Sequence, residues 1–556
     1  MGNHVKRIQL SAEIVEGDVL CVGGGIAGLF AAIRAGELGA RVIVADKANT
    51  LRSGSAATGN DHFQCYLPEF HGPDIEPVIA YRKRRMGLGG VGLSDAAVRV
   101  RIEKSTEIVE RLESWGVPMK YKGKYEFAGH AIPGVDFFLH LKYAGMNQKP
   151  VLTREARKQG VRIVNRVMVF DLIYNNGRPV GAIGVDTRND KIVIFHVKSV
   201  ILATGLCGRL YPSPTPGWMF NRADSPHTTG DGRAMAYRAG AELMNMELIH
   251  RWAGPKYFSR CGKGTWVGVF RDPQGKAVGP FVTKPDRKYG DAISDAYSGL
   301  FDDYVKSGKG PVYMDCRGIT DEDYDYMIYW LKQEGNCALV DHLQEEGIDL
   351  KKNPVEFMTY EMSTRGGVSF NERGETSLPG LYAGGDEYFG AGAAAFGWIS
   401  GENAARYAAK KKALDPAKGK DSIAQHKAFF ESIRNRQAGA GWQEVNAAVN
   451  QVMYDYAGTV RYETLLEAGL AHLLRIKHKA SEALVANNAH ELMHCLEVLN
   501  LIDIAETVFV AIRERRETRE SYNRLDYPFR NPVLDGKTLF CRKGKRGPVT
   551  EWKKIR

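Results

Sequence analysis

The chain has 556 residues, of which 44% are hydrophobic and 25% are charged, and it carries a formal net charge of +11. It is longer than the roughly 250–300 residues at which a single core stops growing, so two or three domains are expected. This ordinary globular composition excludes a largely disordered chain, and the dispersed Lys and Arg residues show no nucleic-acid-binding motif.

The amino-terminal segment and the cysteines bear on location and metal content. No apolar run is long enough to cross a membrane, and the amino end lacks the apolar core of a signal peptide, so we expect a cytoplasmic protein without a direct membrane span. The eight cysteines are scattered, with no CxxC pair. Neither an iron–sulfur cluster nor another metal site is therefore predicted within the chain, and reduced thiols are expected.

The first predicted elements form a dinucleotide-binding unit. An apolar strand, residues 18–22, breaks into the glycines Gly23, Gly25 and Gly28 and continues as a helix. Gly23 allows the turn, Gly25 lets the backbone approach a pyrophosphate, and Gly28 lets the helix pack closely on the strand. The next strand ends in Asp46, where a ribose hydroxyl needs an acceptor. The alternative is a glycine-rich turn that binds no ligand.

Two further apolar strands are predicted far apart in the chain, at residues 199–205 and 380–386. Both end in small residues that a flat ligand could approach. The second is followed by a glycine-punctuated loop and an alanine-rich helix, residues 390–410, whose amino end could point at a ligand. The long segment between the two strands is therefore predicted to be an insertion that makes the first domain discontinuous.

The carboxy-terminal part is predicted to be helical and then extended. From about residue 413, apolar residues recur at three- and four-residue spacings, which indicates a helical packing domain. Beyond Pro528 the chain is expected to wrap the surface, and it carries a basic cluster at residues 542–546. Such clusters are usually solvated, and the alternative is a docking surface for an acidic protein.

Taken in order, these motifs resemble those of one family. The matching segments are 23–28 with Asp46, 52–59, 203–205, 227–242, 365–367, 380–386 and 517–528. Over nearly its whole length the chain resembles the flavoprotein subunits of the fumarate reductase, succinate dehydrogenase and adenylylsulfate reductase family, and adenylylsulfate reductase alpha-like proteins in particular. The resemblance implies an α/β fold with a discontinuous Rossmann-like FAD-binding domain (1–239 and 361–412), an inserted α+β capping domain (240–360), a helical domain (413–527) and an extended basic tail (528–556).

The resemblance also implies FAD, rather than NAD, as the cofactor. Family members with covalent flavin carry a His where this chain has Gly54, so the FAD is expected to be non-covalent. A helix cap is the alternative role for the segment that contains Asp231. The residues expected to bind FAD are Gly23, Gly25, Gly28, Asp46, Lys47, Ser53, Gly54, Gly59, Ala203, Thr204, Gly205, Asp231, Gly385 and Asp386.

Two departures from the family concern the substrate. The dicarboxylate enzymes hold their substrate with a His where Met362 stands, and with an Arg in the flavin loop, where this chain has residues 393–398 and no cation. Adenylylsulfate reductase also has a His at the position of Met362. Each lost charge-assisted hydrogen bond is worth ~1.5–3 kcal/mol, so efficient fumarate chemistry is not expected.

Candidate catalytic residues follow from the same resemblance. Arg260 lies in a stretch similar to one that contributes a catalytic arginine in adenylylsulfate reductase, and Arg365 could replace the missing anion contact. His62 follows the flavin-lining segment as a candidate proton donor. The alternatives are a surface arginine, a structural ion pair and an ordinary loop histidine. Three more residues, Gln64, Met362 and Trp398, are expected to face the substrate, although a tryptophan there is more often core.

We therefore expect an FAD-dependent oxidoreductase that moves two electrons between flavin N5 and a small anionic substrate beneath the cap. A ferredoxin-like iron–sulfur subunit is the expected electron partner, as in adenylylsulfate reductase. One alternative is an enzyme like fumarate reductase or succinate dehydrogenase. Another is an electron-transfer subunit whose substrate pocket is vestigial.

Overall fold

The computed structural model describes residues 7–88, 94–128, 138–213, 219–222, 224–256, 265–278, 284–287, 304, 307–388, 392–519 and 522–554. Among these residues, no helix has both the length and the apolar composition needed to cross a membrane.

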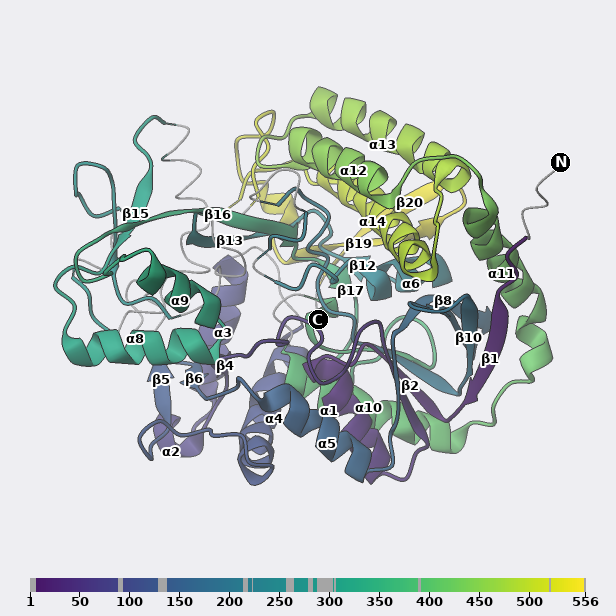
Figure 1. Ribbon diagram of the computed structural model, residues 1–556, viewed down its shortest axis with the longest axis horizontal. Helices are drawn as coiled ribbons and strands as arrows, with labels where there is room; N and C mark the ends of the chain where they lie inside the picture. The colour runs from purple at the N-terminus through teal and green to yellow at the C-terminus, as the bar shows by residue number, and fades with distance from the viewer. Residues whose placement is uncertain are drawn as a thin grey trace.

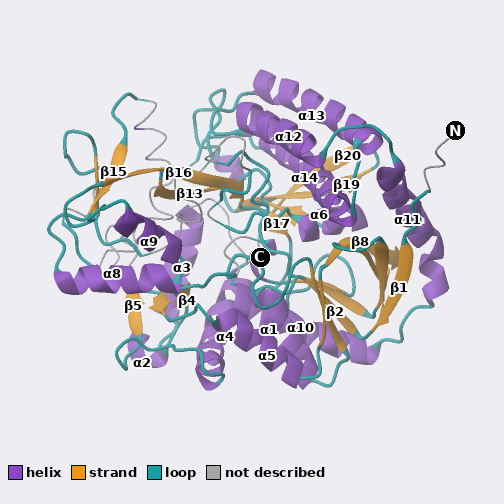
Figure 2. Cartoon of the chain, in the orientation of Figure 1, coloured by secondary structure: helices purple, strands orange, loops and turns teal. Residues whose placement is uncertain are grey.

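A five-stranded parallel sheet, in the order β18–β11–β2–β3–β7, forms the centre of the cofactor-binding part. Its strand β2 is labelled in Figures 1 and 2. Most of its residues are buried, as expected for parallel strands covered on both faces. Val200 of β11 pairs with Leu381 of β18, so a strand from late in the chain completes a sheet that begins near the amino terminus. The strands are β2 (Val19–Val22), β3 (Val42–Asp46), β7 (Arg162–Asn165), β11 (Ser199–Leu202) and β18 (Leu381–Ala383).

Helices cover one face of this sheet and a second sheet covers the other. The helices are α1 (Ile26–Glu37), α5 (Gln148–Lys158) and α10 (Ala393–Lys410). The helices α1 and α10 pack closely because Gly397 and Gly401 have no side chain. A Cβ at either position would overlap the backbone of α1. The second sheet contains β1 (Ser11–Glu16), β10 (Lys191–His196), β9 (Arg178–Asp186) and β8 (Val167–Asn175), in that order.

A small layer of strands and helices follows the flavin-lining segment. Its three-stranded sheet places β6 (His140–Lys142) between β4 (His62–Gln64) and β5 (Glu126–Ala128). The helix α4 (Asp95–Ser114) packs against α10 and against α3 (Glu76–Leu88). A short helix, α2 (Pro68–His71), lies between β4 and α3 in the chain.

The described residues of 249–364 are here called the inserted unit, and most of their elements lie at the left of Figure 1. Its sheet has the order β13 (Ile249–Pro255), β16 (Val355–Thr364), β15 (Val312–Asp315) and β14 (Val269–Arg271). Two helices, α8 (Asp321–Gln333) and α9 (Cys337–Glu345), belong to it. Trp266, Trp330 and Phe357 contribute to a core of its own. The predicted α+β insertion is confirmed, whereas its exact boundaries stay a prediction.

The carboxy-terminal part is helical, with α11 (Lys420–Asn435), α12 (Trp442–Ala457), α13 (Glu463–Ala483) and α14 (Ala489–Glu514). The mostly buried α14 packs against α6 (Asp231–Ala239) of the cofactor-binding part. Beyond it, β19 (Lys537–Gly544) and β20 (Gly547–Lys554) form a hairpin. That hairpin joins β12 (Leu243–Met244) and β17 (Gly367–Val368) in one sheet, so the segment expected to be extended has a specific paired form. Three short 3₁₀ helices complete the described elements: η1 (Gly385–Glu387), η2 (Pro416–Gly419) and η3 (Pro532–Leu534).

Candidate active site

A cavity of about 560 Å³ lies where β2, β3 and β11 end. This size is within the range of small-molecule and cofactor sites, and the carboxyl ends of parallel strands are where such folds bind ligands. Of the residues expected to bind FAD, most line this cavity: Gly23, Gly25, Asp46, Lys47, Ser53, Gly54, Gly59, Ala203, Thr204, Gly205 and Asp231.

The turn between β2 and α1 has the shape that a pyrophosphate needs. Gly23 has a positive φ of 99°, and a Cβ there would overlap the carbonyl oxygen of Ala203. A Cβ at Gly25 would meet no atom within 4 Å, because this residue faces open space at the amino end of α1. Gly28 does not line the cavity, and a Cβ there would overlap Gly23. The loop therefore fits an anionic dinucleotide held at a helix amino terminus.

Asp46 organises the loop opposite this turn. Its carboxylate accepts hydrogen bonds from the Gly24 N–H at 2.8 Å, the Ala48 N–H at 2.8 Å and the Ser53 hydroxyl at 2.9 Å. Behind the turn, the ammonium of buried Lys149 donates to the Gly24 carbonyl, and burial lowers the pKa of Lys149 to about 8. The sequence motif gave no indication that Lys149 places a buried amine beside the pyrophosphate loop.

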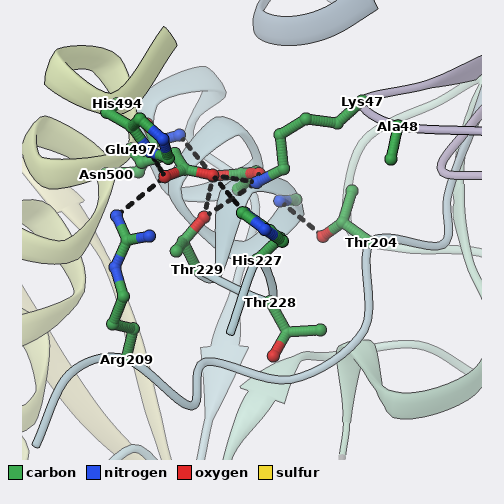
Figure 3. A network of polar contacts seen from close by, with 12 residues as sticks. Lys47, Ala48, Thr204, Arg209, His227, Thr228, Thr229, His494, Glu497 and Asn500 are labelled. Carbon is green, nitrogen blue, oxygen red and sulfur yellow. Dashed lines mark hydrogen bonds and ion pairs between the residues drawn. The ribbon is translucent and has the colours of Figure 1, made fainter. Parts of the chain in front are cut away.

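A buried polar network joins this end of the cavity to α14 (Figure 3). Lys47 donates to Asp231 at 2.8 Å and to Glu497 at 2.6 Å. Arg209 and His494 also contact Glu497, each at 2.7 Å, and Asn500 donates to Asp231 at 2.8 Å. Burial acts to raise the pKa of Glu497, but Arg209 and Lys47 hold it well below its usual range. The helical part thus fixes two residues that line the cavity.

Glu387 is a second buried carboxyl group that sequence reasoning missed. It accepts hydrogen bonds from the backbone N–H and the hydroxyl of Thr204, and burial raises its pKa to about 7. The glycine motif points instead to its neighbour Asp386, at which the motif ends. Gly384, rather than Gly385, lines the cavity. The signal in the sequence was that a second carboxyl residue, Glu387, directly follows Asp386.

A guanidinium group lies at the flavin-loop end of the cavity. Arg101 of α4 lines the cavity and is 7% exposed, with its Nη2 3.4 Å from Oε1 of Gln64. A Cβ at Gly392, just before α10, would lie 2.5 Å from Nε of Arg101, so glycine makes room for the cation. The signal in the sequence was that Arg101 falls, at helical spacing, on a face whose other residues are mostly apolar.

His62 lies beside this end of the cavity in a second polar cluster. Its Nδ1 contacts buried Asp61, which is also 3.0 Å from Lys142 and 2.7 Å from the Thr265 hydroxyl. Glu334 of the inserted unit lines the cavity and accepts the Asp61 N–H at 2.7 Å. A polar wall therefore runs from the flavin-lining segment to the inserted unit.

The other expected site residues do not line the cavity. Trp398 is fully buried, with the Arg111 guanidinium 4.0 Å from its ring centroid and Phe30 at its edge, so it packs in the core rather than lining this cavity. Met362 on β16 also belongs to a hydrophobic core cluster. Arg365 follows this strand away from the cavity lining, and its N–H donates to Leu248.

Two expected residues cannot be placed. Arg260 and the side chain of Asp386 lie outside what the structure describes.

The sequence matches two family models. Residues 18–396 match the FAD binding domain, and residues 446–554 match the fumarate reductase flavoprotein C-term. In the fumarate reductase (CoM/CoB) of Methanothermobacter marburgensis, one subunit is 24% identical over 96% of this chain and 98% of its own length. The fumarate reductase flavoprotein subunit of Haemophilus influenzae is 23% identical over 94% of this chain and 91% of that protein.

The fold is similar to that of solved flavoproteins. The structure of adenylylsulfate reductase from Archaeoglobus fulgidus superposes with a TM-score of 0.82 and 20% identity, over 99% of this chain and 98% of that one. The family-model match covers more than half of the chain, and the glycine turn, the Asp46 loop and the cavity fit a flavin dinucleotide. The chain is therefore an FAD-dependent oxidoreductase and belongs to the fumarate reductase, succinate dehydrogenase and adenylylsulfate reductase flavoprotein family.

Proposed function

We propose that the protein transfers two electrons between FAD and a small anionic substrate bound between the flavin loop and the inserted unit, which acts as its cap. The observation that carries this proposal is the cavity-lining guanidinium of Arg101 beside Gln64. Arg101 reaches the flavin loop from α4, where the dicarboxylate enzymes use an arginine of the loop itself. The cation lost from the loop sequence is thus replaced from another helix.

Anion recognition and water exclusion are the roles of the surrounding residues. A guanidinium binds carboxylates and oxoanions through charge-assisted hydrogen bonds, which are stronger when buried. Glu334 closes the cavity from the inserted unit. When bound, FAD supplies the hydride chemistry at N5. His62 is the proton donor in this proposal, and Arg260 is a further candidate for stabilising charge on the substrate.

The substrate pair to test first is sulfite with AMP, as in an adenylylsulfate reductase. Gly54 supports this choice, because its position offers no histidine for a covalent flavin bond. The alternative substrate is fumarate or succinate, which the curated relatives favour by name. Non-covalent FAD is part of the proposal, and release of free FAD on acid precipitation of the protein would test it.

The electron partner is proposed to be an iron–sulfur protein. None of the seven described cysteines belongs to a metal-ligating group, so among the described residues the chain offers no cluster of its own. The β19–β20 turn carries the exposed basic residues Arg542, Lys543, Lys545 and Arg546, which suit an acidic partner.

The proposal is tested by mixing anoxic holoenzyme separately with sulfite plus AMP, with succinate, and, after reduction, with fumarate. We expect one of these to change the absorbance of the bound flavin. If none does while a co-purified iron–sulfur protein reduces the FAD, the chain is an electron relay with a vestigial pocket and the proposal fails.

A further inference from the structure

Asp61 is the point at which the flavin-lining segment and the inserted unit meet. Its side chain is fully buried. Its carboxylate contacts His62 on one oxygen, and Lys142 and Thr265 on the other. Its backbone N–H donates to Glu334 at 2.7 Å. Two of these four partners, Thr265 and Glu334, come from the inserted unit.

The contact between the two parts is tight on both sides. A Cβ at Gly59 would overlap the carbonyl of Gln333 at the end of α8. A Cβ at Gly335 would overlap the side chain of Thr58. Glycine on each side thus lets the end of α8 rest directly on the flavin-lining segment, next to Asp61.

His62 lies next to the cavity at this contact. It does not line the cavity itself, although Phe63 and Gln64, the other residues of β4, both do. His62 and Gln64 share a face of the strand, and both meet His140, with ring centroids 5.3 Å apart for His62 and a 2.9 Å hydrogen bond for Gln64. Ligand atoms of Asp61, His62 and Glu334 lie within 4.8 Å of one another.

This cluster is better suited to acid–base work than to a metal ion. The Lys142 ammonium is 3.0 Å from the Asp61 carboxylate and already supplies the positive charge that a metal would bring. Burial acts to raise the pKa of Asp61, but Lys142 and then His62 hold it well below its usual range. An ionised carboxylate only accepts, so the contact with His62 requires a proton on Nδ1.

We propose that Asp61 is a positioning residue that couples closure of the inserted unit to the proton-donating arrangement of His62. With Thr265 and Glu334 in place, the Asp61 carboxylate is fixed and holds the His62 ring by its Nδ1–H, which leaves Nε2 as the nitrogen that exchanges protons. When the inserted unit moves away, Asp61 loses the Thr265 hydroxyl and the Glu334 acceptor together. The inference rests on the proposed function, because it gives His62 its role there.

The test uses FAD-loaded protein and two variants of the inserted unit, Thr265→Val and Glu334→Leu, each of which removes a hydrogen-bonding group that meets Asp61. The first measurement is the ¹⁵N spectrum of histidine-labelled protein, with His62 assigned through a His62→Gln variant. The second is hydrogen exchange of the segment 58–64. We expect wild-type His62 to carry its proton on Nδ1 and both variants to lose that preference. In both variants, hydrogen exchange of the segment 58–64 should accelerate roughly tenfold. This corresponds to a loss of about 1.4 kcal/mol in the free energy of local opening.

Thr507→Val is the matched control, because Thr507 is a buried threonine whose hydroxyl bonds locally, to Ile504 at 2.7 Å. It should leave both readouts unchanged. If Thr265→Val and Glu334→Leu accelerate exchange but leave the His62 tautomer as in wild type, the coupling is refuted. If His62 carries its proton on Nε2 in wild type, the positioning role is refuted even when the other variants behave as expected.

Asp61→Ala adds a direct test, since it removes both acceptor oxygens and should abolish the Nδ1–H preference of His62. These readouts need no substrate. A positive result together with no flavin response to any substrate pair would therefore refute the proposed function while leaving the coupling intact.

Discussion

Arg101 shows how one residue can change the chemistry expected of a site. Its guanidinium lies at the flavin-loop end of the cavity because α4 packs on α10 and because Gly392 has no side chain to exclude it. The loop itself carries no cation at residues 393–398. The proposed anion binding therefore depends on a helix that the family motifs do not include.

Replacing Arg101 should lower kcat/KM far more than it lowers the free energy of unfolding. For Arg101→Gln we expect kcat/KM to fall about 10- to 100-fold, because one charge-assisted hydrogen bond worth ~1.5–3 kcal/mol is lost. Arg101→Lys should recover part of the lost kcat/KM, because lysine restores the positive charge but not the planar set of guanidinium donors. Steady-state kinetics with whichever substrate reacts measures this. An unchanged kcat/KM in Arg101→Gln would remove Arg101 from the site.

Glu387 makes stability depend on pH in an unusual direction for a carboxyl group. Burial raises its pKa from the ordinary 4.5 to about 7, so the folded protein holds this proton more tightly than the unfolded chain does. The stability that this group contributes is complete below about pH 4.5 and is lost as the pH rises to about 7. Glu387→Gln should remove this slope. Urea unfolding of both proteins across this pH window checks it, and parallel profiles would contradict the assignment.

At the scale of the element, different glycines of the strand–turn–helix unit serve folding and cofactor binding. Gly28 is needed because α1 packs on the turn, whereas Gly25 faces the open cavity. The sequence motif assigns the same two roles, and the space around each glycine agrees with them.

We therefore expect two alanine variants to fail in different ways. Gly25→Ala should fold normally, since the φ of Gly25 is −69° and its Cβ would meet no protein atom, but it should bind FAD at least tenfold more weakly because the methyl occupies pyrophosphate space. Gly28→Ala should lower the thermal unfolding temperature of the apoprotein itself. Calorimetry of the apoproteins and FAD titration separate the two, and equal unfolding temperatures for both variants would be the contrary result.

The sequence predicted these elements well because their signals are local. Glycine spacing, apolar runs and terminal carboxylates placed the parallel sheet, the cofactor loop and the insertion. Trp398 and Met362 were predicted by analogy to face the substrate, whereas the structure packs both in the hydrophobic core. Arg101 and Glu334 line the cavity, and Glu387 bonds to cavity-lining Thr204, through contacts between distant segments, which local sequence signals alone could not place.

At the scale of the whole molecule, Glu497 binds the helical part to the cofactor-binding part. It contacts Lys47, Arg209 and His494 in a fully buried setting (Figure 3). Its removal would leave the buried Arg209 without its carboxylate and Lys47 with Asp231 alone. Such an imbalance is among the costlier single changes in a folded protein.

Glu497→Gln should lower the free energy of unfolding by about 3–5 kcal/mol and weaken FAD binding, because Lys47 and Asp231 line the cavity. Denaturant unfolding and FAD titration measure the two effects. The exposed Glu113–Lys120 pair provides the control, and Glu113→Gln should cost less than about 1 kcal/mol. A similar cost for both variants would show that the network is not a structural hub.

The contribution of α14 to the cavity also sets an order of events during synthesis. Asp231 gains Asn500, and Lys47 gains Glu497, only after the ribosome has made α14. The hairpin that pairs with β12 follows later still. This polar end of the cavity therefore cannot assemble on a nascent chain that ends before Glu497, however early the glycine turn at its other side has been made.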